Sequence, residues 1–170
     1  MNTELFTGKA EHYAKARPGY PVEAIEYIKS LVPQNAVFAD IGAGTGKFTE
    51  LLAENGYTVF AVEPNADMRK QLMVVLDPYQ NANSVDGSAE ATMLPDHSVD
   101  VITCAQSLHW FDPGAFKAEC KRIGKHDCIM MAVYNNTPDG SSITHSKLST
   151  DVFFHNPDVR EFPNPIFYKS

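Results

Sequence analysis

Short apolar runs and helix-spaced apolar residues alternate along this chain. The runs are rich in β-branched and aromatic residues, which favour strands, whereas the segments between them place apolar residues three or four positions apart, which favours helices. Strands are expected at residues 37–40, 58–63, 83–86, 99–104 and 128–134, and helices at residues 21–32, 48–55, 65–77 and 113–123. Because strand and helix alternate throughout, we predict an α/β fold with a doubly wound parallel sheet and helices on both faces.

The expected helices begin and end at residues that suit helix termini. Asn65 and Asp112 are capping residues, Pro113 suits the first helical position, and Asn55 followed by Gly56 is typical of a helix end. The strand at 128–134 is apolar throughout, so we expect it to be buried on both faces.

Three glycines at every second position follow the first expected strand. The run at 37–47 reads Val-Phe-Ala-Asp-Ile-Gly-Ala-Gly-Thr-Gly-Lys. Glycine accepts a positive φ angle without steric cost, and its missing Cβ lets a bound molecule lie against the backbone. An ordinary strand-to-helix turn does not need three glycines in five residues, so we predict a ligand-binding loop at the carboxyl end of this strand.

The spacing of this loop separates the kinds of ligand it can hold. A phosphate-binding P-loop requires glycine where Ile41 stands and Ser or Thr where Phe48 stands, so that motif is excluded. A dinucleotide-binding loop fits Gly42 and Gly44, but Lys47 stands where its third small residue belongs. The spacing therefore disfavours NAD without excluding it.

A second acid and three later runs accompany the loop. Glu63 ends the next expected strand, where an acid can accept hydrogen bonds from both hydroxyls of a ribose. With the pattern Asp-x-Gly-x-Gly-x-Gly at 40–46 and the runs at 86–90, 94–102 and 105–112, this succession resembles the small-molecule branch of the class I S-adenosylmethionine-dependent methyltransferases, which includes quinone-biosynthesis and trans-aconitate methyltransferases. The resemblance spans about residues 10 to 134, and it implies a Rossmann-like sheet with S-adenosylmethionine as cofactor.

The resemblance also implies roles for residues at the carboxyl ends of the strands. Asp40 would hold the methionine ammonium of the cofactor directly or through water, and Gly42 and Gly44 would flank the methyl donor. Glu63 would accept hydrogen bonds from the ribose, and Met68 would lie against the adenine face. The complete expected cofactor-binding set is Tyr13, Arg17, Asp40, Gly42, Ala43, Gly44, Glu63, Pro64, Met68, Ser88, Ala89, Glu90, Ala105 and Gln106. At the adenine edge the chain departs from the family, because many members carry Asp at the position of Ser88.

Three assignments have a simpler alternative. Asp40 is otherwise a strand-end acid that caps the following turn. Arg17 lies in a proline-punctuated segment that resembles the family's N-terminal lid, where it would pair with the methionine carboxylate, or else it is a surface residue beside a turn. His109 is the candidate general base, or it forms an aromatic pocket wall with Trp110 and Phe111.

Composition and charge limit the kinds of molecule that this chain is expected to bind. The 170 residues include 21 acids and 14 bases, for a net charge of -7, and no run of Lys or Arg is present to neutralise a phosphate backbone. Three cysteines in apolar or helical contexts indicate reduced thiols, and the histidines lack the short spacing of a metal site. Neither a signal-peptide pattern nor a run of membrane-spanning length occurs. We expect a cytoplasmic protein that holds no metal and binds neither nucleic acid nor membrane.

The end of the chain departs from the seven-stranded family fold. Five strands are counted by residue 134, residues 135–140 resemble a loop, and residues 162–167 lack a hairpin pattern. We therefore expect one domain, with residues 1–34 as lid and first helix, residues 35–134 as cofactor-binding core, and residues 135–170 as an insertion near the substrate opening or a truncated C-terminal part. The last one or two strands would be missing, and a free edge at the fifth strand would favour a homodimer.

These features together favour methyl transfer from S-adenosylmethionine to a small-molecule acceptor. Two other classes of function stay open. One is a non-enzymatic module that binds the adenosyl cofactor or only a partner chain. The other, which the loop spacing disfavours, is a nicotinamide-dependent oxidoreductase.

Overall fold

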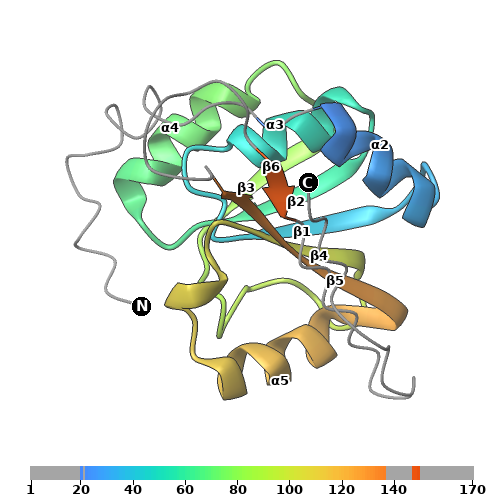
Figure 1. Cartoon of the computed structure of the whole chain (residues 1–170). Helices are drawn as coiled ribbons and strands as arrows, with labels where there is room; N and C mark the ends of the chain where they lie inside the picture. Colours follow the sequence, from blue (N-terminus) through green and yellow to red (C-terminus); the bar gives the residue numbers. More distant parts are fainter. Residues whose placement is uncertain (1–19, 21, 137–146, 150–170) are drawn as a thin grey trace.

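A sheet with the strand order β3-β2-β1-β4-β5-β6 forms the middle layer of the molecule (Figure 1). The computed structural model of the chain describes residues 20, 22–136 and 147–149. The strands are β1 (Val37–Ile41), β2 (Thr58–Val62), β3 (Ala82–Val85), β4 (Val99–Ala105), β5 (Gly124–Asn136) and β6 (Lys147–Ser149). The first five pair in parallel, and β6 runs antiparallel to β5. The predicted Rossmann-like α/β sheet is confirmed.

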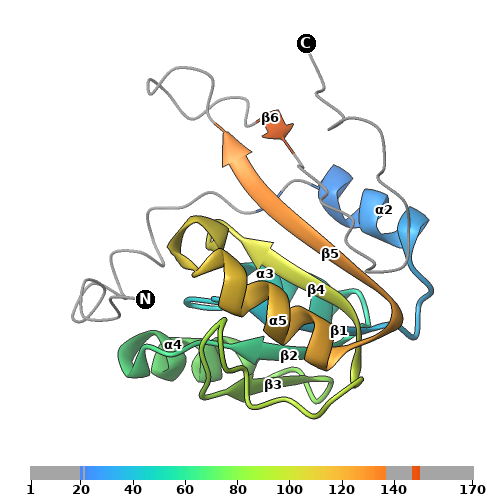
Figure 2. The same cartoon turned by 90° about the horizontal axis from the view of Figure 1, so that it is seen from below.

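Helices lie on both faces of the sheet, as the alternation predicts. On one face lie α2 (Val22–Leu31), α3 (Lys47–Glu54) and α4 (Ala66–Leu76), and on the other lies α5 (Pro113–Ile123) (Figures 1 and 2). The predicted caps are confirmed, because Asn65 Oδ1 accepts from the N–H of Asp67 and Asp112 Oδ1 accepts from the N–H of Ala115. Within residues 20–136 and 147–149, no helix has both the length and the apolar character needed to cross a bilayer.

Two buried clusters hold the layers together. Alternate residues of a strand project to opposite faces, so Phe38 of β1 packs on the side of α3 and α4, while Ile41, three residues later, packs on the side of α5. Both side chains are fully buried. This two-sided burial fixes the central strands, whose carboxyl ends carry the loops described below.

The fifth strand and its surroundings differ from the prediction. The strand begins at Gly124 and reaches Asn136, so residues 135 and 136 belong to a strand and the predicted loop is wrong there. A further strand follows, because Tyr134 to Asn136 pair with β6, and the edge of β5 is not free along these residues. Asparagine has a low strand propensity, and the pairing with β6 overrides it.

The burial of β5 also differs from the prediction of a strand buried on both faces. Residues 131–133 are buried, but residues 128–130 are only half-buried. Cys128 and Met130 face the side of α5, where β5 is incompletely covered. Burial on both faces is therefore wrong for the first half of the apolar run.

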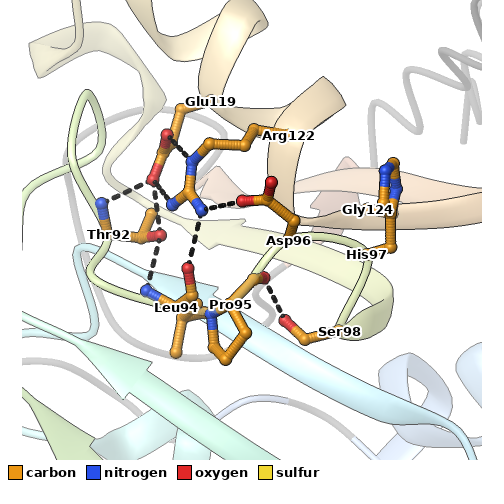
Figure 3. A network of polar contacts seen from close by, with 9 residues as sticks. All are labelled: Thr92, Leu94, Pro95, Asp96, His97, Ser98, Glu119, Arg122 and Gly124. Atoms are coloured by element: carbon orange, nitrogen blue, oxygen red, sulfur yellow. Dashed lines mark hydrogen bonds and ion pairs between the residues drawn. The ribbon is translucent and has the colours of Figure 1, made fainter.

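A polar network holds the long connection between β3 and β4 against α5 (Figure 3). Glu119 of α5 accepts hydrogen bonds from the backbone N–H of Thr92 at 2.7 Å and from its hydroxyl at 2.6 Å. Arg122 donates to Glu119, to the carbonyl of Leu94 at 2.8 Å and to Asp96 at 2.6 Å. The hydrogen bond from Arg122, with help from Thr92, lowers the pKa of Glu119 to about 2 although burial opposes the shift. The buried charge is thus matched by a cation and two local donors.

Replacing Glu119 by Gln should destabilise the fold at neutral pH by about 1 to 3 kcal/mol, because the folded chain favours the ionised carboxylate. The loss is limited because Arg122 is partly exposed and water screens its charge. A group whose pKa is depressed on folding contributes stability above its unfolded value of 4.5. That contribution disappears as the pH falls toward about 2. Urea unfolding of both chains at neutral and acidic pH measures the difference. In a matched control, Glu26→Gln removes the exposed i,i+3 pair with Lys29 and should cost at most about 0.5 kcal/mol.

Candidate functional site

The carboxyl ends of β1, β2 and β4 meet at one edge of the sheet, where the glycine loop follows β1. Gly42, Gly44 and Gly46 have φ angles of 70°, 60° and 91°. A Cβ at Gly42 would lie 2.7 Å from Ser107 Cβ, and one at Gly46 would lie 2.6 Å from Leu72 Cδ1. A Cβ at Gly44 would meet no described atom within 4 Å. Gly42 and Gly46 therefore allow close packing inside the protein, whereas Gly44 borders space that no described residue fills and that a ligand can enter.

The glycine loop is fastened to the loop after β2. The N–H groups of Gly42 and Ala43 both donate to the carbonyl of Val62, at 2.9 and 3.1 Å. Glu63 accepts from the N–H of Gly44 at 2.9 Å with one oxygen and from the N–H of Asn65 at 2.9 Å with the other. Each carboxylate oxygen has two acceptor positions, so Glu63 retains capacity for further donors.

Glu63 is an acid held in a nearly dry position. It is 7% exposed. Burial raises its pKa, and the N–H groups of Asn65 and Gly44 limit the rise. The carbonyls of Glu63 and Pro64 accept from the Arg69 guanidinium at 2.9 and 2.7 Å, and Arg69 also pairs with Asp86 at the end of β3. Arg69, which is absent from the predicted set, therefore braces the second loop against the third strand.

Asp40 is fully enclosed one residue before the end of β1. Its two oxygens accept from the hydroxyls of Thr49 in α3 at 2.7 Å and Thr103 in β4 at 3.0 Å. Burial raises the pKa of Asp40 to about 6, although the two threonine hydroxyls lower it, and Glu63 adds a smaller repulsion. The carboxylate thus joins three elements beneath the glycine loop. Its predicted role toward the cofactor ammonium stays a prediction.

The end of β4 forms the third side of the site. Ser107 donates from its hydroxyl to the carbonyl of Ile41 at 2.7 Å, directly beside the glycine loop. Gln106 has a φ angle of 60°, and its N–H donates to the carbonyl of Val133 in β5. Ala105 and Gln106 are half-buried at this edge. The structure therefore brings both predicted residues of this segment next to the loop, with Ser107 as an additional contact.

The loop after β3 approaches the same edge. Ser88 and Ala91 exchange backbone hydrogen bonds at 3.0 and 3.2 Å, which forms a tight turn around Ala89. Ala89 is buried in the cluster that contains Ile41. Glu90 accepts from the N–H of Asp112 at 3.0 Å, so this loop is tied to the start of α5.

Hydrogen bonding holds Glu90 in its ionised form. Burial opposes ionisation, but the bonds from the Asp112 N–H and the Ser88 hydroxyl outweigh it and lower the pKa of Glu90. Met68, at the start of α4, is 4% exposed, so little of its side chain is presented to an adenine in this conformation. The adenine contacts of these residues stay predictions.

The aromatic segment after β4 is only partly buried. His109 and Trp110 lie in a short 3₁₀ helix, η2 (Leu108–Trp110), with ring centroids 4.9 Å apart, and both are exposed. Phe111 is buried and packs on Phe116. The arrangement leaves both alternatives open for His109, a general base or part of an aromatic wall. Tyr13 and Arg17 lie outside the described residues.

Sequence reasoning missed four residues that hold this site together: Thr49, Arg69, Thr103 and Ser107. Two of them give a signal, because Thr103 is a hydroxyl in an apolar strand and Thr49 lies next to the apolar face of a helix. That signal becomes specific only when the strand order places them around Asp40.

Comparison with known proteins assigns the family. A methyltransferase domain matches residues 39–132, which is more than half of the chain. An uncharacterized methyltransferase of Mycobacterium tuberculosis is 38% identical over 111 residues, covering 65% of this chain and 44% of the relative. An uncharacterized methyltransferase-like protein of Schizosaccharomyces pombe is 32% identical over 142 residues, covering 82% and 54%. The chain thus spans about half the length of these curated relatives.

Solved structures agree with this assignment. A putative type II methyltransferase from Anaeromyxobacter dehalogenans superposes with a TM-score of 0.63 at 31% identity, over 71% of this chain and 50% of that one. An S-adenosylmethionine-dependent methyltransferase from Aquifex aeolicus shares the fold, with a TM-score of 0.62 at 20% identity, over 69% of this chain and 68% of that one. The chain therefore belongs to the class I S-adenosylmethionine-dependent methyltransferases, as its glycine loop and second-strand acid predict.

Proposed function

We propose that this chain binds S-adenosylmethionine at the joined carboxyl ends of β1, β2 and β4 and takes part in methyl transfer to a small-molecule acceptor. The observation that carries the proposal is the open space beside Gly44, whose N–H is held by the buried acid Glu63. The surroundings suit a nucleoside that carries positive charge. The net charge of -7 and the lack of a Lys or Arg run support a small acceptor over nucleic acid.

The residues present fit the parts of that cofactor. Glu63 has spare acceptor positions for ribose hydroxyls. Gly44 offers a surface without a side chain, and Asp40, ionised above about pH 6, supplies a negative charge beneath the loop that favours a cation above it. When bound, the cofactor supplies an activated methyl group, so the protein's work is binding and alignment.

Alignment is the main catalytic contribution that we assign to the chain. Holding an acceptor in line with the methyl group can lower the barrier by ~7 to 11 kcal/mol, with no obligatory base. The braces from Ser107 and Arg69 keep the loops in place for this purpose. His109 is the candidate base if the acceptor must lose a proton.

Titration calorimetry of the chain with S-adenosylmethionine, S-adenosylhomocysteine and NAD tests the proposal. We expect the first two ligands to bind and NAD to show no heat of binding. Binding of NAD alone would overturn the cofactor assignment, and no binding by any of the three would favour a module that binds only a partner chain. Mass spectrometry of small carboxylates and other small acceptors after incubation with the cofactor tests transfer itself.

Replacing Glu63 by Ala should weaken S-adenosylmethionine binding by ~1 to 3 kcal/mol, the usual effect of losing a charged hydrogen-bond partner. Calorimetry of the two chains gives the change in Kd. Glu54→Ala is the control, because Glu54 is exposed and contacts Tyr79 away from the loop. Equal Kd values for the Glu63 variant and the parent chain would refute the ribose role.

Two glycine variants should separate binding from folding. Both Gly44→Ala and Gly46→Ala place a Cβ at positive φ, which costs about 1 to 2 kcal/mol. Only at Gly46 does the Cβ also meet a packed side chain, that of Leu72, so Gly46→Ala should have the lower Tm. Gly44→Ala should stay folded and lose at least about tenfold in cofactor affinity, since its Cβ fills the ligand space. A Gly44 variant with undiminished affinity would contradict this location of the ligand.

Cofactor affinity should rise with pH through the titration of Asp40. The pKa of Asp40 is about 6 in the folded chain, against an ordinary value of 3.8. Between these two pH values the folded chain holds a proton on Asp40 that the unfolded chain has lost, so the stability of the fold decreases as the pH rises from about 4 to about 6. A cationic ligand favours the ionised form, so its affinity should increase as the pH rises toward about 6 and level off above that value, and binding near and below pH 6 should release a proton. Calorimetry in two buffers of different ionisation enthalpy counts that proton. Asp40→Asn should flatten the pH dependence, and a variant that keeps the full slope would assign it to another group such as Glu63.

A further inference from the structure

One row of side chains across the sheet places an acid and a hydroxyl between apolar neighbours. Asp40 of β1 is in register with Thr103 of β4 on one side and with Ala61 of β2 on the other, and Thr103 is in register with Met131 of β5. Residues in register on parallel strands project to the same face of the sheet. All four side chains are fully buried. Within this row, Thr103 is therefore the strand neighbour that offers Asp40 a polar group.

The hydroxyl of Thr103 lies close to two acceptors. Its oxygen is 3.0 Å from Asp40 Oδ1 and 3.5 Å from the carbonyl oxygen of Ala39, the residue before Asp40. A hydroxyl has one hydrogen to donate and two lone pairs that can accept. Because the shorter distance makes the stronger hydrogen bond, the hydrogen points to Asp40 while that carboxyl is ionised.

The same hydroxyl can serve the protonated carboxyl after a rotation of its own hydrogen. A protonated Asp40 has a hydrogen to donate, and Thr103 Oγ1 can accept it across the same 3.0 Å. The Thr103 hydrogen then points to the Ala39 carbonyl, and that hydrogen bond is poorer because the two oxygens are 3.5 Å apart. Both forms of the acid are accommodated, but the ionised form receives the better set of hydrogen bonds.

The remaining groups around Asp40 come from three elements. From α3, the hydroxyl of Thr49 donates to the second carboxylate oxygen at 2.7 Å. After β2, Glu63 opposes the ionisation of Asp40 by repulsion and so raises its pKa. On β4, the thiol of Cys104 beside Thr103 stays protonated, because burial raises its pKa well above the ordinary value. Two hydroxyls thus favour the charged acid against burial and the repulsion from Glu63.

A buried acid with a hydroxyl partner is a poor way to stabilise a core. Burying a charge costs free energy that hydrogen bonds only partly offset, and apolar residues of similar volume are often as stabilising or more so. The acid lies one residue before the end of β1, beneath the loop in which Gly44 borders the space for a ligand. Its position therefore indicates a role at the ligand edge, and Thr103 shares that role through its hydrogen bond.

We propose that Thr103 is a positioning residue for Asp40, whose hydroxyl donates to the ionised carboxylate beneath a bound cation and accepts from the protonated carboxyl when the cation is absent. Asp40 releases its proton to solvent as the cationic ligand binds and regains it from solvent as the ligand leaves. This inference rests on the proposed function for the identity of the cation, but the two hydrogen-bond arrangements are a property of the chain without ligand.

Replacing Thr103 by Val tests the proposal in the full chain without ligand. Valine has nearly the same shape but no hydroxyl, and the charged acid loses more than the neutral one because hydrogen bonds to charged groups are stronger. The pKa of Asp40, about 6 in the parent chain, should rise by about one pH unit. Carbon-13 NMR of the aspartate carboxyl carbons during a pH titration measures this change, and Asp40→Asn identifies the signal. Thr103→Ser keeps the hydroxyl and should titrate like the parent chain.

Calorimetry with S-adenosylmethionine at two pH values separates a change in charge from a loss of structure. Affinity follows the fraction of chains in which Asp40 is ionised. If the pKa rises by about one pH unit, Thr103→Val should bind about threefold more weakly than the parent chain at pH 6.5 and about equally at pH 8. A purely structural role for Thr103 would weaken binding by the same factor at both pH values.

Thr92→Val is the matched control. Thr92 is also fully buried, and its hydroxyl donates to a carboxylate, that of Glu119, at 2.6 Å (Figure 3). This variant should have a lower Tm than the parent chain and should leave the titration of Asp40 in place. If Thr103→Val does not fold, Thr103→Cys supplies a weaker donor and should raise the pKa of Asp40 by a smaller amount.

Three outcomes would overturn the proposal. The first is an unchanged pKa of Asp40 in Thr103→Val, and the second is a Thr103→Ser variant that titrates like Thr103→Val. The third is equal weakening of S-adenosylmethionine binding at pH 6.5 and pH 8. Failure of the parent chain to bind S-adenosylmethionine would instead refute the cofactor proposal, and the NMR titration would still decide the role of Thr103.

Discussion

The buried carboxylate of Asp40 constrains the carboxyl-terminal edge of the sheet more than any other described group that we identify here. Asp40 has no exposed surface, and only the hydroxyls of Thr49 and Thr103 donate to it among the described side chains. Burying an acid is costly unless donors surround it. The requirement therefore holds β1, α3 and β4 in one relative position, and the glycine loop begins two residues later. The loop owes its fixed shape to this buried contact as much as to its glycines.

Hydrogen bonds between adjacent loops also stabilise the rest of this edge of the sheet. Glu63 holds the backbone of Gly44, Ser107 holds the carbonyl of Ile41, and Arg69 holds the loop after β2. Each brace crosses from one strand end to the next, so no loop depends on its own sequence alone. A site supported in this way is largely formed before a ligand arrives, which lowers the ordering cost of binding.

The sequence predicts what local chemistry determines. Strand and helix positions follow from apolar spacing, the helix starts at Asn65 and Asp112 follow from capping, and the ligand loop follows from its glycines. What it could not predict depends on which elements become neighbours. Thr103 acquires its role toward Asp40 only when β4 lies beside β1, and the last residues of β5 pair with β6 as far as Asn136. Cys128 and Met130 are likewise only half-buried, which an apolar run does not reveal.

The clamp between α5 and the chain before β4 has a mechanical consequence. Glu119 accepts a hydrogen bond from the N–H of Thr92, and Glu90 accepts one from the N–H of Asp112. The helix α5 and the connection that contains Ala89 are therefore joined at two points along the helix. A shift of α5 along the sheet therefore requires at least one of these hydrogen bonds to break, and the position of the helix and the conformation of the connection before β4 are set together.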